Sequence, residues 1–266
     1  MSTFLKSGLN ESDFLFQCAV GFSSRPQPNP DTLTIWKSGY VRLFVSHRDH
    51  IKIYARQLAD LLDGYGVSAF VAHETIEPMT TWRHEIIKGL ETMEIMLAIV
   101  TDDFHQSFWT NQEVGFALGR GTPIISLKVQ ESEPPGFIEE KQAVRGSLTD
   151  PSPSASAVYN LIANRLGQHD RLKKTVIAAF LDSPDFTESQ SRFNRMSSVV
   201  EALTDEELEQ IKSSYKSNDQ LHNCIYLNSN YNRLVKFIQN CTNKKFKIEN
   251  KQIIDVRSSL DEDLPF

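Results

Sequence analysis

The chain of 266 residues is long enough for one sizeable domain and a smaller one. Its 28 Lys and Arg residues against 34 Asp and Glu residues give a net charge of −6, which removes any general electrostatic attraction to nucleic acid or to an anionic membrane. No apolar stretch approaches the roughly 20 residues that a bilayer-spanning helix needs, so we expect a cytoplasmic protein whose partners include neither nucleic acid nor a membrane.

Residues 1–39 are interpreted as an arm that leads into the fold. They lack the charged start and the apolar run of a signal peptide. An apolar patch at Phe14–Phe22 is followed by Pro26, Pro28 and Pro30, and closely spaced prolines disfavour regular structure. We therefore expect the first domain to cover residues 40–167.

That domain alternates short apolar runs with longer segments of helical period. The runs are rich in β-branched residues, as strands buried on both faces of a parallel sheet should be. They are Val41–Val45, Val67–Val71, Ile95–Val100 and Pro123–Val129, with a fifth strand expected near Gln142–Leu148. These runs predict parallel strands.

The segments between the runs place apolar residues three and four apart, which predicts helices that pack one side on a sheet. They are Ile51–Leu62, Trp82–Leu90 and Trp109–Leu118, and a closing helix over residues 152–166 is expected to start at a cap, Ser152 or Ser154. The repeated order of strand, helix and strand predicts a doubly wound α/β layer.

Residues 168–266 are expected to form a second, mainly helical domain. Helical periods run over Asp170–Leu181, Phe186–Leu203 and Tyr231–Cys241, and alternation within residues 244–256 predicts a short terminal strand. The spacing of a capping box marks two helix starts, at Asp185 with Glu188 and at Thr204 with Glu207. This domain shows no catalytic motif, and we interpret it as a packing or interaction module through which an effector or sensor protein would bind.

Polar segments follow the first three predicted strands, and in an open parallel sheet ligands bind where the loops at the carboxyl ends converge. Ser46, His47, Arg48 and Asp49 follow the first strand, HETIEPMTTW (residues 73–82) follows the second, and TDDFHQSFW (residues 101–109) follows the third. Trp109 and Glu113 lie four apart on a predicted helix, so they share a face and would line one cleft. Taken alone, this pair is more typical of a solvated carboxylate beside a packed indole.

A metal site is not favoured by the spacing of the possible ligands. The histidines of the first domain are scattered without an HxxxH pair: His47, His50, His73, His84 and His105. The three cysteines, Cys18, Cys224 and Cys241, have neither CxxC spacing nor the density of a disulfide scaffold. We therefore expect no metal and a reducing compartment.

Two further chemistries are disfavoured. Ser46 beside His47 makes a poor nucleophile and base, because neighbours on a strand point to opposite faces and the chain has no GxSxG elbow. The GRGTP segment at residues 119–123 lacks both phosphate-loop patterns, so we interpret it as a helix stop.

Several segments, taken in order, carry a resemblance to a known family. They are VRLFVSHRD at the first strand, the IEP-x-x-x-W loop ending in Trp82, and FxxSxWTNQE leading to GRGTPIISLKV. Together they resemble the Toll/interleukin-1 receptor (TIR) domain family over approximately residues 40–166. The resemblance implies a flavodoxin-like five-stranded parallel sheet with flanking helices, which agrees with the strand and helix pattern.

Many bacterial and plant members of that family, and one animal axon-degeneration enzyme, cleave the nicotinamide–ribose bond of NAD+. The resemblance thus implies an NAD+ glycohydrolase or ADP-ribose cyclase that makes a nucleotide signal or depletes NAD+ in antiphage defence. NAD+ is then the substrate, no cofactor is expected, and the TIR domain is expected to self-associate. The family motif makes Glu113 the expected catalytic residue and places Ser46, His47, Arg48, Trp82 and Trp109 at the substrate.

The chain departs from the family pattern in the loop after the second strand. Pro78-Met79 stands where Pro-Gly is usual, and Ala72 and His73 stand where an acidic residue is common, with Glu74 the nearest carboxylate. Two alternatives remain open. One is a non-catalytic TIR signalling module, and the other is an enzyme resembling nucleoside deoxyribosyltransferases on a related α/β layer.

Overall fold

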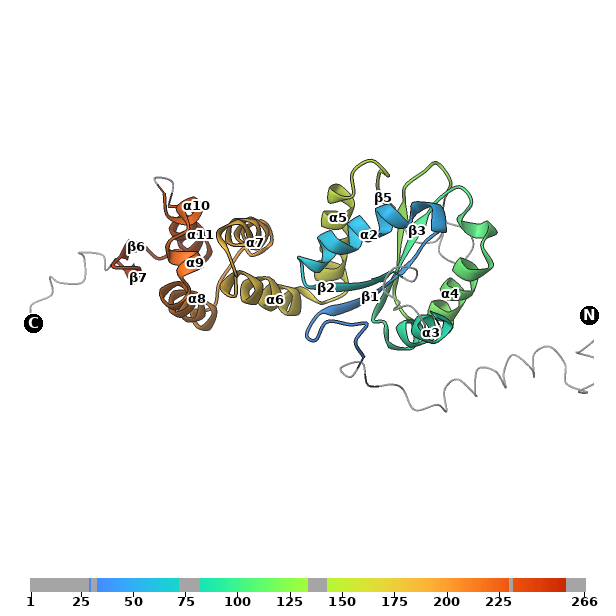
Figure 1. Cartoon of the computed structure of the whole chain (residues 1–266), viewed down its shortest axis with the longest axis horizontal. Helices are drawn as coiled ribbons and strands as arrows, with labels where there is room; N and C mark the ends of the chain where they lie inside the picture. The colour runs from blue at the N-terminus through green and yellow to red at the C-terminus, as the bar shows by residue number, and fades with distance from the viewer. Residues whose placement is uncertain (1–28, 30–32, 72–81, 134–142, 230–231, 257–266) are drawn as a thin grey trace, which may run out of the picture.

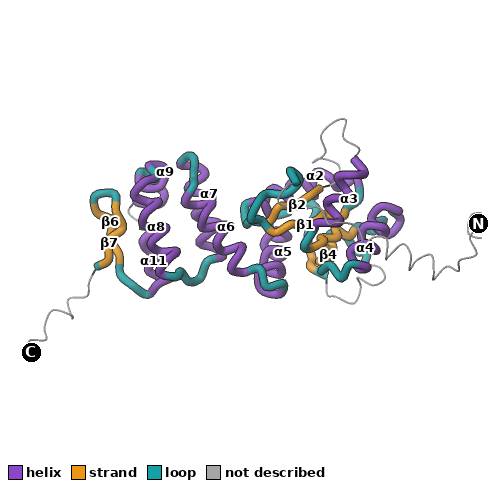
Figure 2. Tube along the Cα trace, turned by 90° about the horizontal axis from the view of Figure 1, so that it is seen from below, coloured by secondary structure: helices purple, strands orange, loops and turns teal. Residues whose placement is uncertain are grey.

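The computed structural model describes residues 29, 33–71, 82–133, 143–229 and 232–256. Two units lie end to end along the long axis of the molecule, an α/β unit first and a helical unit after it (Figure 1). Figure 2 shows the same order from a perpendicular direction. Within the ranges given above, no helix combines the length and the apolar character needed to cross a bilayer.

The α/β unit is built on a five-stranded sheet in the order β2-β1-β3-β4-β5, and every pair of neighbours is parallel. The strands are β1 (Val41–Ser46), β2 (Val67–Val71), β3 (Ile95–Val100), β4 (Ile124–Lys128) and β5 (Val144–Arg145). This is the predicted flavodoxin-like sheet, and the central β3 is buried along its whole length. The fifth strand is shorter than its predicted range, because only Leu127 and Lys128 of β4 pair with it.

Helices cover both faces of the sheet, and the alternation of side chains along each strand divides the core in two (Figure 1). Leu43 and Val45 of β1 pack with α2 (Lys52–Asp63) and α5 (Ser152–Arg165). Phe44, between them, faces the other way, into a cluster formed with α3 (Trp82–Thr92) and α4 (Phe108–Gly119). Because both faces are buried, the strands need to be apolar at nearly every position.

The predicted cap of α5 by Ser152 or Ser154 is wrong. The backbone N–H of Ser152 donates to the carboxylate of Asp150 at 2.9 Å, so an aspartate two residues upstream supplies the acceptor. Ser154 is fully buried, and its hydroxyl accepts a hydrogen bond from the Tyr54 hydroxyl at 2.9 Å. The serine therefore joins α5 to α2 instead of capping the helix.

The helical unit has a hydrophobic core of its own. It consists of α6 (His169–Leu181), α7 (Phe186–Val199), α8 (Asp205–Ser217), α9 (Asp219–His222), α10 (Ile225–Asn228), α11 (Arg233–Thr242), β6 (Phe246–Glu249) and β7 (Gln252–Asp255). Both predicted helix starts are present: Asp185 accepts from the Glu188 N–H at 2.8 Å, and Thr204 with Glu207 forms a complete capping box.

Two predictions for this unit needed correction. The run expected to reach Leu203 ends as a helix at Val199. The single terminal strand is an antiparallel hairpin of β6 and β7, in which Asn250 and Lys251 both have positive φ, 50° and 59°. Two consecutive residues of positive φ are the requirement of a tight type I′ hairpin turn, and it reverses the chain midway through the alternating segment.

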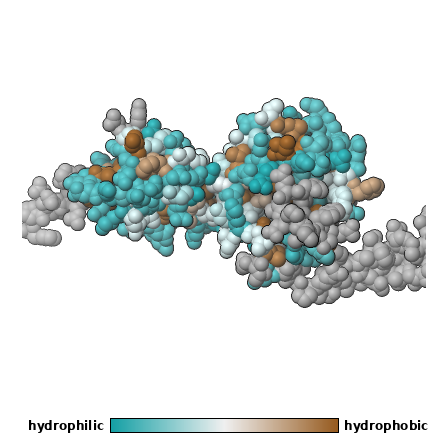
Figure 3. Space-filling model, in the orientation of Figure 1, coloured by the Kyte–Doolittle hydropathy of each residue, from teal (hydrophilic) through white to brown (hydrophobic). Residues whose placement is uncertain are grey.

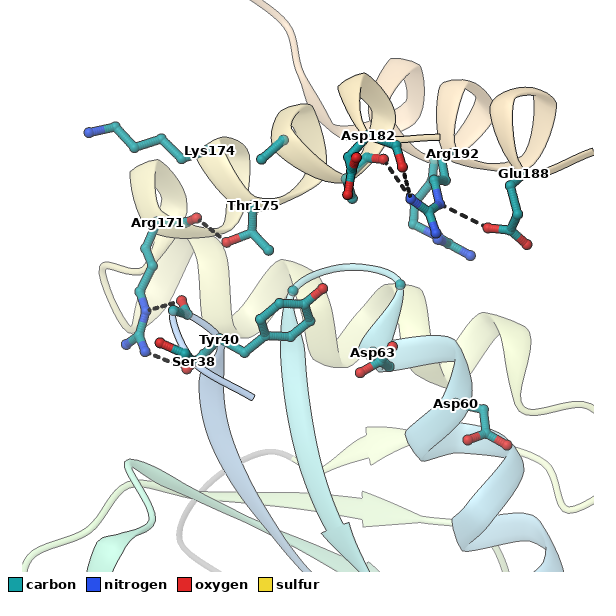
Figure 4. A pocket seen from close by; sticks show the side chains of 16 residues that line it. Ser38, Tyr40, Asp60, Asp63, Arg171, Lys174, Thr175, Asp182, Glu188 and Arg192 are labelled. Atoms are coloured by element: carbon teal, nitrogen blue, oxygen red, sulfur yellow. Dashed lines mark hydrogen bonds and ion pairs between the residues drawn. The ribbon is translucent and has the colours of Figure 1, made fainter. Parts of the chain in front are cut away.

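Arg171 of α6 joins the helical unit to the α/β unit at the amino-terminal end of the sheet (Figure 4). Its Nε donates to the carbonyl of Gly39 at 2.9 Å, one Nη donates to Glu94 at 2.7 Å, and the other Nη donates to the carbonyl of Tyr40. Nearby, Thr175 of α6 lies against Gly66, the residue before β2. The helical unit therefore docks at the end of the sheet opposite to the carboxyl ends of the strands.

A pair of glycine substitutions tests this docking contact. Gly66 and Gly39 have similar positive φ, 83° and 80°, but a Cβ on Gly66 would lie 2.9 Å from Thr175, whereas one on Gly39 would meet nothing within 4 Å. We expect Gly39→Ala to lose about 1 kcal/mol of unfolding free energy through backbone strain. Gly66→Ala should lose at least about 1 kcal/mol more by overpacking against α6. Urea unfolding measures both losses, and equal losses would contradict the contact.

The surface of both units is mostly hydrophilic in the view of Figure 3, and apolar residues appear there in small groups. Across the described residues, the large apolar side chains with the highest exposure include Phe108 at 85% and Ile225 at 80%. Phe108 opens α4, the helix that carries Glu113. An exposed aromatic ring beside a candidate site is more informative than a scattered surface residue.

Candidate active site

Glu113 lies inside the protein, on α4 and beside the carboxyl end of β1. Its exposed fraction is 7%, and one carboxylate oxygen accepts a hydrogen bond from the Ser46 hydroxyl at 2.6 Å. Ser46 is the last residue of β1 and is fully buried. Interpreting Glu113 as a solvated helix carboxylate is therefore wrong, since the carboxyl group is packed against the edge of the sheet where the loops converge.

Burial changes the acid strength of this carboxyl group. Desolvation raises the pKa of Glu113 to about 7, and the hydrogen bond from Ser46 acts in the opposite direction. Loss of hydration penalises the charged form, while a donor aimed at the carboxylate favours it. Near neutral pH the side chain is thus divided between its protonated and charged forms, a condition often found in catalytic groups.

The start of α4 is fixed by polar contacts that set the position of Glu113. Ser107 caps the helix by accepting from the Thr110 N–H at 3.3 Å. The Thr110 hydroxyl donates to the carbonyl of Phe104 at 2.7 Å, and the Asn111 amide donates to the carbonyl of His105 at 2.8 Å. These bonds tie the first turn of α4 to the short 3-10 helix η4 (Phe104–Gln106). The helix ends at Gly119, and Gly121 adopts a positive φ of 68°, as expected for the GRG stop.

A cavity of about 550 Å³ opens between α3 and α4 and reaches Glu113. The lining residues are Ile86, Ile87, Leu90, Phe108, Trp109, Gln112, Glu113 and Phe116. Trp109 is 45% exposed, so its indole forms part of the wall while remaining accessible. The structure thus brings Trp109 and Glu113 to one cavity, and among the described residues its lining is mainly apolar and aromatic, with one carboxyl group.

The other predicted site residues occupy different positions. His47 is buried, with Nδ1 2.9 Å from the carbonyl oxygen of Arg48. Arg48 lies at the carboxyl edge but is not among the residues that line the cavity, and its Nε donates to Asp103 at 2.9 Å. Trp82 begins α3, and its side chain lies outside the described residues. The departures from the family pattern at residues 72–79 also fall outside them.

Sequence reasoning missed three residues at this edge. Phe108 and Gln112 line the cavity, and Asp103 binds Arg48. The signal for the first two was present, because residues 108, 109, 112, 113 and 116 repeat at intervals of three and four and so share one face of α4. Asp103 had no such signal, since its contact depends on a partner 55 residues away.

Removing the Ser46 hydroxyl should raise the pKa of Glu113. The hydroxyl donates to the carboxylate, so its loss in Ser46→Ala disfavours the charged form. A hydrogen bond to a charged group contributes about 1.5–3 kcal/mol, which corresponds to an increase of about one pKa unit or more. The measurement is an NMR titration of the Glu113 carboxyl carbon.

Ser68→Ala is the matched control for this titration. Ser68 is also a buried strand serine, but its hydroxyl accepts from the backbone N–H of Lys37 and does not contact Glu113. The Glu113 titration should therefore be unchanged in this variant. An unchanged titration in Ser46→Ala would show that the Ser46 hydroxyl does not influence the carboxylate.

Comparison with known proteins finds a family whose model matches the part of the chain that carries this site. A family model described as the TIR domain matches residues 43–162, a span that begins in β1, ends in α5 and includes both Ser46 and Glu113. None of the curated proteins compared with the chain matches it.

Solved structures of similar proteins include two from animals. One is the TIR domain of the Toll-related receptor TRR-2 from Hydra magnipapillata, with 14% identity and a TM-score of 0.38, covering 49% of this chain and 98% of that one. Another is a TIR-STING receptor from C. gigas in complex with 2′,3′-cGAMP, with 12% identity and a TM-score of 0.39. That match covers 63% of this chain and 55% of the receptor.

Proposed function

Because residues 43–162 of this chain form a TIR domain, we propose that the protein is an enzyme that cleaves the nicotinamide–ribose bond of NAD+. The observation that carries this proposal is the buried Glu113 carboxyl group, held by Ser46 at the edge of a cavity that Trp109 also lines. A buried carboxyl group at the wall of a cavity, with a pKa that desolvation raises to about 7, is typical of catalytic sites and supports an enzyme over a signalling scaffold.

The reaction suits a site with one carboxylate. When the bond between the ribose C1′ and the nicotinamide nitrogen breaks, its electron pair goes to the nitrogen, and a positively charged ring leaves as neutral nicotinamide. The ribose is left with oxocarbenium-like positive charge, which an adjacent carboxylate stabilises most strongly in a site of low dielectric constant. Glu113 takes that role in our proposal.

The acceptor of the ribosyl cation decides the product. If water attacks, it loses a proton and gives ADP-ribose, so the enzyme is a glycohydrolase. If an adenine nitrogen of the same molecule attacks, the product is a cyclic ADP-ribose. Both outcomes use the same bond cleavage and the same carboxylate, and we propose that the product, or the loss of NAD+, serves antiphage defence.

The other residues of the edge take supporting roles. Trp109 and Phe108 offer aromatic surface against which the ribose or the nicotinamide ring can pack. Ser46 is fully buried, so we assign it to holding Glu113 and not to direct contact with the substrate. Because Phe108 is 85% exposed beside the cavity, a second copy of the domain is the proposed cover of this wall. The helical unit is the proposed binding site for an effector or sensor protein.

The test is product analysis by mass spectrometry. The purified full chain is incubated with NAD+ over a wide range of protein concentrations, and in parallel with a deoxynucleoside and a free base. The proposal expects nicotinamide release from NAD+, with activity per molecule that rises with protein concentration. Base exchange on the deoxynucleoside would instead support the transferase alternative, and no reaction in either mixture at any concentration would support a non-catalytic TIR module.

A further inference from the structure

Arg48 is held in place at the carboxyl edge of the sheet by an aspartate in the loop that follows the neighbouring strand, β3. Its Nε lies 2.9 Å from one carboxylate oxygen of Asp103, which follows β3 by three residues. The two side chains are partly exposed, at 28% and 32%. The pair therefore lies at the rim of the edge and within reach of a ligand.

The position of the Asp103 carboxylate is itself fixed by a buried hydrogen-bond donor. Its second carboxylate oxygen accepts a hydrogen bond from the Thr101 hydroxyl at 2.8 Å, and Thr101 is only 1% exposed. Burial acts to raise the pKa of Asp103, but the hydrogen bonds from Thr101 and Arg48, together with the positive charge nearby, outweigh it, so the pKa lies below its usual value. The carboxylate stays charged at neutral pH, with His50 Nδ1 3.8 Å from the oxygen that faces Arg48.

The contact between Asp103 and Arg48 uses Nε of the guanidinium group and leaves its other end available. In the part of the chain that the structure describes, no residue accepts a hydrogen bond from the terminal nitrogens of Arg48. A guanidinium group carries five N–H donors in a rigid plane and binds phosphate oxygens in pairs. Fixing one edge of that plane lowers the entropy lost when the other edge binds an anion.

We propose that Asp103 is a positioning residue for the substrate: by holding Nε of Arg48, it presents the terminal guanidinium nitrogens to the diphosphate group of a dinucleotide. The inference rests on the proposed function for the identity of the substrate. Arg48 comes only two residues after Ser46, the partner of Glu113. In this proposal, a ligand with its ribose at Glu113 extends its diphosphate toward the rim where Arg48 lies.

Fold stability alone does not explain the arrangement. A single ion pair between partly exposed side chains contributes about 0–1 kcal/mol. Asp103 instead combines a buried hydroxyl donor, an arginine and a histidine on one carboxylate, which determines the direction of the arginine more than it strengthens the fold. Substrate affinity is the property that such an arrangement would alter.

The test compares Asp103→Ala with Asp102→Ala, its immediate neighbour. Asp102 also carries a carboxylate held by hydrogen bonding, but it accepts from the backbone N–H of Ser132 and does not contact Arg48. For Asp103→Ala we expect the KM for NAD+ to rise about tenfold with kcat changed less than about twofold, because the lost interaction acts in binding. Asp103→Asn should fall between wild type and Asp103→Ala, since an amide oxygen still accepts from Nε.

A second measurement separates this inference from the proposed function. Calorimetric titration with ADP-ribose and with inorganic pyrophosphate requires no cleavage, and Asp103→Ala should weaken the binding of both by about tenfold. If wild type binds ADP-ribose in this way but does not cleave NAD+, the proposed function fails and the positioning role stands. The positioning role is overturned if Asp103→Ala lowers kcat at unchanged KM, or if Asp102→Ala raises KM equally.

Discussion

Replacing Glu113 with Gln should abolish the release of nicotinamide from NAD+, with a loss in kcat of about a thousandfold or more. The amide has nearly the same size and still offers an oxygen to the Ser46 hydroxyl, so the hydrogen bond at 2.6 Å has an equivalent acceptor. What disappears is the negative charge that stabilises the ribosyl cation. One well-placed electrostatic group in a site shielded from water contributes about 10²–10³ in kcat, and a full charge should contribute at least as much.

Glu201→Gln is the matched control for this experiment. It makes the same chemical change at an exposed carboxylate between α7 and α8, in the helical unit. Nicotinamide release and thermal stability should both be unchanged in it. Continued turnover of NAD+ by folded Glu113→Gln, within about tenfold of wild type, would remove Glu113 from the reaction and with it the proposed mechanism.

The stability of the wild-type protein should fall as the pH rises from about 4.5 to about 7, and Glu113→Gln should lack this fall. The pKa of Glu113 is about 7 in the folded protein and about 4.5 in an unfolded chain. Between these values the folded protein holds a proton that the unfolded chain has released, so raising the pH favours unfolding. A difference of that size corresponds to about 3 kcal/mol at pH 8.

Urea unfolding of wild type and Glu113→Gln at pH 4.5, 6, 7 and 8 measures this difference. As the pH rises from 4.5 to 7, the free energy of unfolding of wild type should fall relative to that of Glu113→Gln. Above pH 7 the glutamine variant should be the more stable of the two. If the difference in unfolding free energy between the two proteins stays constant over the whole pH range, the carboxyl group is not buried as the structure has it.

The titration of Glu113 also predicts the pH dependence of activity: kcat/KM should rise with pH up to about 7 and then level off, because the charged form of the carboxyl group is the active one.

Much of the fold was predictable from the sequence because its signals are local. Strands β1 to β4 each correspond to a run rich in β-branched residues, and the helices between them place apolar residues three and four positions apart. Thr204 with Glu207 marked a helix start through spacing alone. The errors were at features that depend on neighbours in space, such as Asp150 serving α5 in place of a serine, and β5 pairing over only two residues.

The candidate site likewise has features that the sequence predicts and features that depend on the tertiary structure. Sequence order placed Ser46 at the end of the first strand and Glu113 on the helix after the third, so both were expected at the carboxyl edge of a parallel sheet, and the structure shows that these two strands, β1 and β3, pair directly. The contact between them could not be predicted, because it depends on how α4 rotates as it packs on the sheet. Asp103 and Arg171 are further cases, with partners 55 and 77 residues away in the chain.

The sequence by itself determined the strands and helices of the α/β unit and their order, and that Trp109 and Glu113 share a helix face, since periodicity and spacing act within a few residues. Only the tertiary structure decided that this carboxyl group is 7% exposed and bonded to Ser46. The physical reason is that desolvation and hydrogen bonding depend on what surrounds a group in space. These two effects set its pKa at about 7, and they distinguish a buried, tuned carboxyl group from an ordinary glutamate on the surface of a helix.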